Sequence, residues 1–210
     1  MLQRTHRWLG LVLIIALAVA CRPAGTAQIQ DPKVTLARVE VVAYYAWPTP
    51  VPTPTPPPAG TPTPTPAPPP PAPDLPLGLA YIFKIENPND VTVTLDQLKF
   101  TAQLEAKKDG QSAYFSVHAP LVDEDMSIPP RTTNELRVTF FLSSRIVTTN
   151  LAVTSGHQLK EMGLTPGAVV KAWWEGIGDY AFGIRAAEGT AIFRTPAGER
   201  VVTFEGEFRK

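Results

Sequence analysis

Cysteine is nearly absent from this 210-residue chain, because Cys21 is the only one. Without a second cysteine no disulfide can form within the chain, so a disulfide framework of the kind common in small exported domains is excluded. An excess of one charge sign is also missing, since 19 Lys and Arg balance 19 Asp and Glu. We therefore expect neither nucleic-acid binding nor a polybasic membrane patch.

The first 20 residues have the three-part organisation of an export signal. Arg4 and Arg7 give a short basic start, residues 8–20 carry no charge, and small residues precede Cys21. This apolar run of about 13 residues is shorter than the roughly 20 residues that a membrane-spanning helix needs. We therefore predict a signal peptide over residues 1–20 rather than an uncleaved anchor.

The segment Leu17-Ala-Val-Ala-Cys21 resembles the lipobox of bacterial lipoproteins, with Ala in place of the usual Leu three residues before the cysteine. The resemblance implies diacylglycerol on the Cys21 sulfur, cleavage before Cys21, and a third acyl chain, such as palmitate, on the new amino group. Each buried methylene contributes about 0.8 kcal/mol, so two or more chains anchor stably. We expect an extracytoplasmic lipoprotein, held to a membrane of the cell envelope by lipid alone. The alternative is an ordinary cleaved signal followed by a stray cysteine.

Proline and threonine dominate residues 48–76, where 16 of the 29 residues are Pro and six are Thr. Proline fixes φ and has no N–H to donate, so this tract favours polyproline II over helix or sheet. Its composition predicts a disordered or semi-rigid segment. The repeated Thr-Pro pairs also resemble O-glycosylated stalks.

A strand is predicted immediately before the tract, because residues 34–46 are dense in β-branched and aromatic side chains. Residues 22–47 are too few to fold alone. We therefore expect the tract to be an insertion within a domain spanning residues 31–210, joined to Cys21 by a short tether at 21–30. The alternative is a stalk that lifts a C-terminal domain off the membrane.

Short alternating strands and turn signals follow the tract. Asn87-Pro-Asn-Asp90 and Lys107-Lys-Asp-Gly110 predict turns, and a phase slip at Asp96-Gln97 predicts a bulge. One short helix is expected near 155–163, where Ser155 and Gln158 have capping-box spacing and Gly163 ends the helix. Strands are predicted at 77–85, 91–106, 114–119, 136–142, 168–175, 179–185, 189–195 and 200–208. This pattern predicts an all-β fold, an antiparallel β-sandwich of the immunoglobulin or fibronectin type III kind.

Several of these segments, in this order, resemble the type-2 late embryogenesis abundant (LEA) family, also called the water stress and hypersensitive response (WHy) domain. The matching segments are Asp31–Val39, Phe83–Asn89 with its Asn-Pro-Asn ending, Val93–Phe100, Ile128-Pro129-Pro130 with the strand after it, and Gly189–Gly198. The resemblance implies a small Ig-like sandwich without catalytic residues or cofactors. It also implies an association with desiccation and stress tolerance.

Few side chains offer chemistry. Asp123-Glu124-Asp125 has oxygens that suit Ca²⁺ but lacks the spaced ligands and glycine of a calcium loop, so a solvated loop is favoured. His118 and His157 stand at no metal-ligand spacing, and we expect both to be structural or on the surface.

Nucleophile motifs are missing as well. Neither Ser143-Ser144 nor Ser155-Gly-His157 forms a Gly-x-Ser-x-Gly elbow, and Gly176-Ile-Gly178 is not a phosphate loop. We expect no enzyme, no metal and no small-molecule substrate. Trp173-Trp174 lies on a predicted strand, where neighbours face opposite sides, so one should enter the core. The other is a candidate surface contact for a partner or glycan, with cross-strand packing as the alternative.

The sequence therefore predicts a non-catalytic binding or structural module of the cell envelope, whose partner is another envelope protein or a surface polymer. A stress-protective protein of the envelope is the first alternative. A cell-surface hydrolase is a weaker one, because no catalytic constellation is present.

Overall fold

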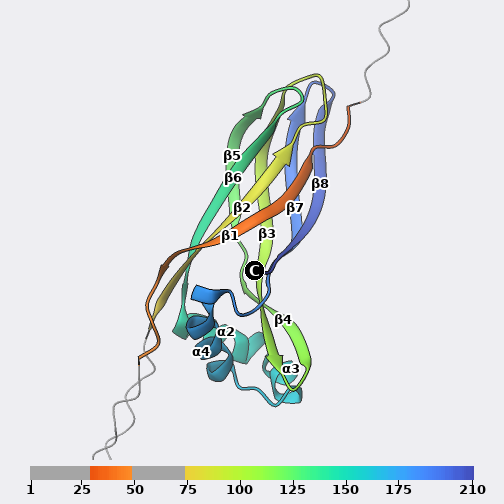
Figure 1. The fold of residues 1–210 in the computed structure, drawn as a ribbon. Coiled ribbons are helices and arrows are strands. Elements are labelled where there is room, and N and C mark those ends of the chain that lie inside the picture. The colour runs from red at the N-terminus through yellow and green to blue at the C-terminus, as the bar shows by residue number, and fades with distance from the viewer. Residues whose placement is uncertain (1–28, 49–73) are drawn as a thin grey trace, which may run out of the picture. The chain divides into compact units, whose positions relative to one another are not determined.

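Two antiparallel β-sheets dominate the fold (Figure 1). The computed structural model describes residues 29–48 and 74–210, and Asp31–Lys210 form one compact unit. The first sheet has the order β1-β2-β6 and is made of β1 (Lys33–Tyr44), β2 (Pro76–Glu86) and β6 (Thr133–Ser143). The second has the order β4-β3-β7-β8, with β5 also paired to β3, and is made of β3 (Val93–Lys108), β4 (Gln111–His118), β5 (Leu121–Ile128), β7 (Ile184–Thr195) and β8 (Gly198–Phe208). The predicted antiparallel β-sandwich is confirmed.

The long strand β3 organises the second sheet. One edge pairs with β5 over Val93–Lys99 and with β4 over Ala102–Lys108, and the other edge pairs with β7. The register shifts between Leu95 and Gln97 on both edges. The predicted bulge at Asp96-Gln97 is therefore confirmed.

The strand before the Pro/Thr tract belongs to the same sheet as the strand after it. β1 pairs with β2 from Lys33 opposite Glu86 to Tyr44 opposite Leu77. The chain thus leaves one strand and re-enters the neighbouring one, with residues 49–73 between them in sequence. The predicted signal peptide and Cys21 lie outside the described residues.

Aromatic rings fill the space between the sheets. Tyr81 and Phe83 of β2 each lie with their ring centroid 5.0 Å from that of Phe100 of β3. Phe140 packs on Tyr81 at 5.5 Å and Phe204 on Phe83 at 5.3 Å. Burying each such ring stabilises the fold by about 1.5–3 kcal/mol. The Tyr81 hydroxyl has no hydrogen-bond partner among the described residues, and burial raises its pKa.

The predicted Asn-Pro-Asn turn is confirmed, and its first residue holds two corners of the sandwich together. Asn87 is only 2% exposed. Its Nδ2 donates to the carbonyl oxygens of Val91, Ile128 and Pro129 at 2.8, 3.0 and 3.0 Å, and its Oδ1 accepts from the Asn89 amide at 3.0 Å. The β2–β3 corner is thereby joined to the turn between β5 and β6.

A helix that was not predicted follows β6. α2 (Ser144–Thr154) begins at the N-cap Ser143, whose Oγ accepts from the Ile146 amide at 3.2 Å. Val147 and Leu151, one helical turn apart, are buried. The segment is rich in Thr, Val and Ile, which have modest helix propensity, but the cap and the apolar face outweigh that preference.

The predicted short helix corresponds to α3 (Gly156–Glu161). Ser155 is its N-cap residue but makes no side-chain capping bond, so the expected capping box is wrong. Gly163, at φ +65°, follows the end of the helix as predicted.

The predicted strand at 168–175 is wrong, because this segment is helix α4 (Pro166–Gly176) followed by the short 3-10 helix η1 (Ile177–Asp179). The Thr165 Oγ1 accepts from the Ala168 amide at 3.3 Å, and proline in the first turn suits a helix start. The buried residues follow helical spacing and are Val169, Val170, Trp173 and Trp174. Burial of that face outweighs the β propensity of these residues.

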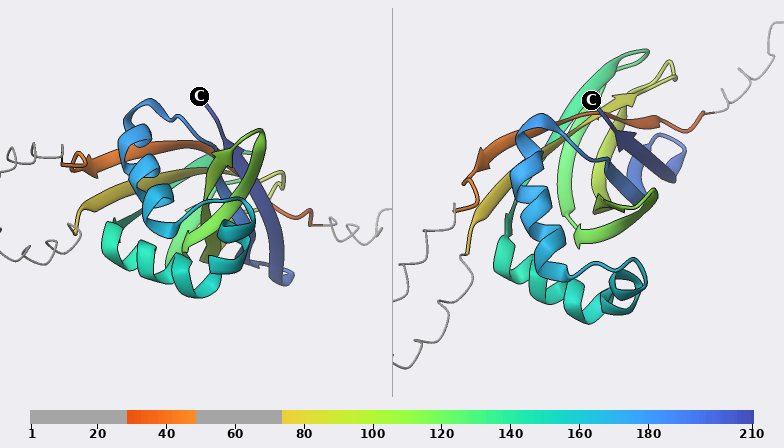
Figure 2. Two further views of the ribbon diagram at one scale, coloured as in Figure 1. Left: turned by 90° about the horizontal axis from the view of Figure 1, so that it is seen from below. Right: turned by 60° about the horizontal axis from the view of Figure 1, so that its bottom comes forward.

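The helices gather at one end of the sandwich (Figures 1 and 2). This helix end also holds the β3–β4 hairpin, whose Lys108 Nζ donates to the Gly163 carbonyl at 2.5 Å. Tyr44 and Pro76, which border the tract, lie there too, because Pro76 pairs with Ser143 immediately before α2. No helix within residues 29–48 and 74–210 is long and apolar enough to cross a membrane.

Candidate functional site

A buried carboxylate with two cations is the strongest charge feature at the helix end. The side chain of Glu105, on β3, is 1% exposed. Its Oε2 accepts from the Gly183 amide at 2.8 Å and lies 3.1 Å from both Lys107 Nζ and Arg209 Nη1. Its Oε1 accepts from Arg209 Nη2 at 3.2 Å. The carboxylate is therefore held by donors from three separate segments.

The main chain of Glu105 is held equally firmly. Its amide donates to the Gly183 carbonyl at 2.9 Å, and its carbonyl accepts from Trp173 Nε1 at 2.7 Å. Only glycine fits at 183, because a Cβ there would lie 2.2 Å from the Tyr114 hydroxyl. These bonds fix helix α4 and the segment before β7 against β3.

Charge states in this cluster are firmly set at neutral pH. Burial acts to raise the pKa of Glu105, but the Gly183 amide, Lys107 and Arg209 outweigh it and hold that pKa below its ordinary value. Burial, together with the Glu207 carboxylate, raises the pKa of Tyr114 to about 12. Neither group is poised to exchange a proton near pH 7. The cluster can hold charge in fixed positions, and it offers no general acid or base.

Two adjoining hollows open beside this cluster. The first, of about 200 Å³, lies between β3 and α4 and is mostly apolar, with walls that include Leu164, Ala168, Ala172, Trp173, Ala181 and Phe182. The second, of about 490 Å³, is polar and runs along the β3–β4 hairpin, with walls that include Lys108, Asp109, Gln111, Ser112 and Arg209. Glu105 and Lys107 line both hollows, so the two adjoin at these residues.

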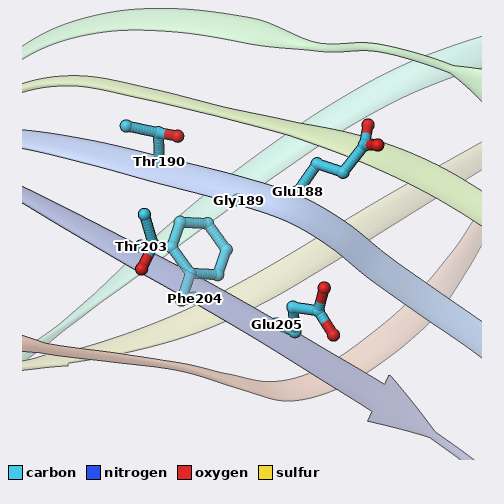
Figure 3. Close-up of a pocket in the computed structure, with 6 residues that line it drawn as sticks. All are labelled: Glu188, Gly189, Thr190, Thr203, Phe204 and Glu205. Atoms are coloured by element: carbon cyan, nitrogen blue, oxygen red, sulfur yellow. The ribbon is translucent and has the colours of Figure 1, made fainter.

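A third hollow, of about 600 Å³, lies along β7 and β8 and is shown in Figure 3. Its lining is Glu188, Gly189, Thr190, Thr203, Phe204 and Glu205. The Phe204 ring lies against Gly189, where a Cβ would be 2.5 Å from the ring. Both carboxylates are already engaged, Glu188 by the Thr101 hydroxyl at 3.0 Å and Glu205 by Arg185 at 2.5 Å. This hollow presents hydroxyls and paired charges.

The predicted surface contact at Trp173 and Trp174 is wrong. Both side chains are buried, at 1% and 0% exposure. Neighbouring residues of a strand face opposite sides, but consecutive residues of a helix lie about 100° apart and can share one buried face. Trp173 is nevertheless one of the residues that line the apolar hollow. Trp174 Nε1 has no hydrogen-bond partner among the described residues.

The acidic run Asp123-Glu124-Asp125 lies within strand β5, not in the predicted loop. Asp123 accepts from Gln97 Nε2 at 2.8 Å, and Asp125 pairs with Arg194 at 2.5 Å. Gln97 lies on the paired strand β3 and Arg194 on β7, one strand further along the sheet. These partners explain how a charged run stays extended. In the part of the chain that the structure describes, no three His, Cys, Asp or Glu side chains are placed to hold a metal ion.

The two described histidines have aromatic or charged neighbours. The His118 ring stacks 4.8 Å from Phe140, and burial lowers its pKa. His157 is exposed on α3 and lies 3.2 Å from Glu161.

Ser144, which was weighed as part of a nucleophile motif, has a structural role. Its hydroxyl oxygen accepts a hydrogen bond from the Leu75 amide at 2.9 Å.

The sequence did not indicate the Glu105 cluster. Buried Leu104 and Ala106 flank Glu105, and strand alternation therefore assigns it to the opposite, solvated face. Gly183, Arg209 and Trp173 cover that face from distant parts of the sequence.

Comparison with known proteins gave limited results. A scan against protein-family models and a search of curated proteins found no match. Among solved structures, an X-ray structure of the structural-genomics target SoR45 is 12% identical, with a TM-score of 0.35 and 86% coverage of both chains. A protein from Archaeoglobus fulgidus is 13% identical, with a TM-score of 0.35 and coverage of 87% of this chain and 97% of that one. A solution structure described as a candidate late embryogenesis abundant protein is 11% identical, with a TM-score of 0.35 and coverage of 99% and 86%. At this level the likenesses assign neither a family nor a function to the chain.

Proposed function

We propose that the chain is a lipoprotein of the cell envelope, whose β-sandwich binds another envelope component without catalysing a reaction. The segment Leu17-Ala-Val-Ala-Cys21 carries this proposal, because an apolar run that ends in small residues before a lone cysteine suits lipid attachment. The lipid would be the only membrane anchor.

The position of the first strand supports an anchored domain close to the membrane. The compact unit begins at Asp31 and β1 at Lys33, so the tether is residues 21–30. Ten extended residues span at most about 35 Å. The lipid would therefore keep the sandwich near the membrane surface.

The helix end supports a binding role. Its hollows have walls fixed by the Glu105 hydrogen bonds and ion pairs, and pre-formed walls lower the cost of ordering on binding. Among the described residues beside them, neither Glu105 nor Tyr114 is poised to exchange a proton near pH 7. Fixed charge around an apolar hollow suits recognition better than bond cleavage.

Fractionation of cells that produce the full chain tests the anchoring. Cys21→Ser should move the protein from the detergent-soluble membrane fraction to the soluble fraction. Ser127→Ala, which changes an exposed small polar residue on β5, should leave it in the membrane fraction. A Cys21→Ser protein that stays in the membrane fraction would refute lipid anchoring.

The resemblance to the type-2 LEA family favours a second candidate, a stress-protective role in the envelope. The Asn-Pro-Asn corner is one of the segments that carry the resemblance, and it is built around the buried Asn87. Survival after drying, compared between wild-type cells and a deletion strain, tests this role. Equal survival would exclude it.

A further inference from the structure

The apolar hollow at the helix end has the form of an anchor pocket. Its lining includes Trp173, which is held by the 2.7 Å hydrogen bond to the Glu105 carbonyl, and Phe182, and both side chains are buried. Ala168 and Ala172, one turn apart on α4, leave its mouth open. At about 200 Å³ the hollow is smaller than the roughly 300–1,000 Å³ of pockets for drug-sized ligands. Its size suits one large apolar side chain.

We propose that this pocket and the adjoining polar groove bind an extended segment of a partner protein, with an aromatic or large aliphatic side chain in the pocket and an acidic residue beside it. This inference rests on the proposed function, since it names the binding surface of the same module. Large apolar side chains that enter well-formed pockets provide much of the affinity at protein interfaces.

The charges around the two hollows favour an acidic neighbour. Three cations line them, and two of these are already paired: Lys107 and Arg209 face the Glu105 carboxylate, and Arg209 also pairs with Glu207. Lys108 forms no ion pair among the described residues. Lys108 donates to a neutral carbonyl oxygen. A carboxylate of the partner would therefore meet a complementary charge.

The direction of β1 favours a protein partner over the membrane itself. β1 begins next to the proposed tether and runs twelve residues to Tyr44 at the helix end. At about 3.3 Å per residue this separates the two ends by about 40 Å. The pocket therefore lies at the end away from the tether, where a protein can reach it.

A peptide titration tests the chemistry. The probe is acetyl-Glu-Phe-Glu amide, added to the mature chain in detergent micelles and followed by the NMR signal of the Trp173 indole N–H. We expect saturable shifts, with acetyl-Glu-Ala-Glu amide binding at least about tenfold more weakly. Equal binding of the Ala peptide, or of acetyl-Lys-Phe-Lys amide, would overturn the proposal.

Two matched variants locate the binding. Ala172→Leu fills the mouth of the pocket from an exposed helical position and should weaken binding at least about tenfold. Ala152→Leu makes the same change at an exposed position on α2, away from the pocket, and should leave binding unchanged. Unaltered binding by Ala172→Leu would overturn the assignment to this pocket. Thermal melting of both variants confirms that they are folded.

Photo-crosslinking in intact cells separates this inference from the proposed function. p-Benzoylphenylalanine is placed at Gln111, in the polar groove, or at Val201, which is exposed on β8. We expect a protein adduct from position 111 that is lost in Ala172→Leu and kept in Ala152→Leu. Its trapped peptide should contain an apolar side chain next to an acidic one. An adduct from position 201 alone would show that the partner binds elsewhere. It would overturn the assignment to this pocket but still support the proposed binding function. No adduct from either position would count against both.

Discussion

Replacing Glu105 with Gln tests whether the buried carboxylate holds the helix end in place. Gln has nearly the same size, and its oxygen can still accept from Gly183, but the charge facing Lys107 and Arg209 is lost. Hydrogen bonds to charged groups contribute about 1.5–3 kcal/mol each. Both cations are about half exposed, and water can solvate them once the carboxylate is gone. We therefore expect Glu105→Gln to lower the free energy of unfolding by about 2 kcal/mol in total.

Urea denaturation followed by circular dichroism measures this change. With a slope of about 2 kcal/mol per molar urea, the midpoint should fall by about 1 M. Glu175→Gln is the control, because Glu175 forms an exposed pair with Lys171 at 3.7 Å. Its midpoint should be unchanged within error.

The pH dependence gives a second test of the same variant. The folded pKa of Glu105 lies below its ordinary value, so the stabilisation is complete above about pH 4.3, the unfolded value. It is lost as the pH falls through the folded pKa. Gln does not titrate, so the difference between wild type and variant should shrink below about pH 4. A difference that is absent at pH 7, or that stays constant into acid, would refute the reasoning.

Three further changes are expected to show in thermal melting. Trp173→Phe should lower the free energy of unfolding by about 1–3 kcal/mol more than Trp174→Phe does, because only the first substitution removes a hydrogen bond. Equal losses of stability in the two variants would contradict this. Gly189→Ala should destabilise by about 1–3 kcal/mol through overlap with the facing phenylalanine ring. In contrast, Gly167→Ala, which meets no atom within 4 Å, should be neutral or stabilising. Asn87→Ala should cost about 3 kcal/mol or more, since three carbonyl oxygens lose their donor, and a melting temperature within error of the wild type would rule this role out.

The strands were predictable because their signal is local. Alternation of Leu79, Tyr81, Phe83 and Ile85 with their neighbours predicted one buried face, and β2 contains all four. Ala80 and Ile82, on its other face, are buried as well. The slip at Asp96-Gln97 marked the bulge for the same reason. Turn chemistry at Asp109-Gly110 was equally local, since both residues have positive φ.

The helices after β6 were not predictable from propensity. Residues 168–175 contain two valines and two tryptophans, which favour a strand when counted alone. The helix is decided by the Thr165 cap and by burial of Val169, Val170 and both tryptophans on one face. That face is buried only because the sandwich supplies a surface to cover, which is tertiary information.

The Glu105 cluster could not be predicted from the sequence for a related reason. Lys107 and Glu105 are close in sequence, but Gly183 and Arg209 approach from 78 and 104 residues away. Alternation assigned Glu105 to solvent, and no motif links it to those residues. The apolar hollow exists only where α4 meets β3.

Mass spectrometry of the mature chain from the membrane fraction tests the central claim of a lipid-anchored module most directly. We predict that its first peptide begins at Cys21 and carries diacylglycerol on the sulfur, with acyl on the amino group. An unmodified Cys21 peptide from the mature protein would contradict the account.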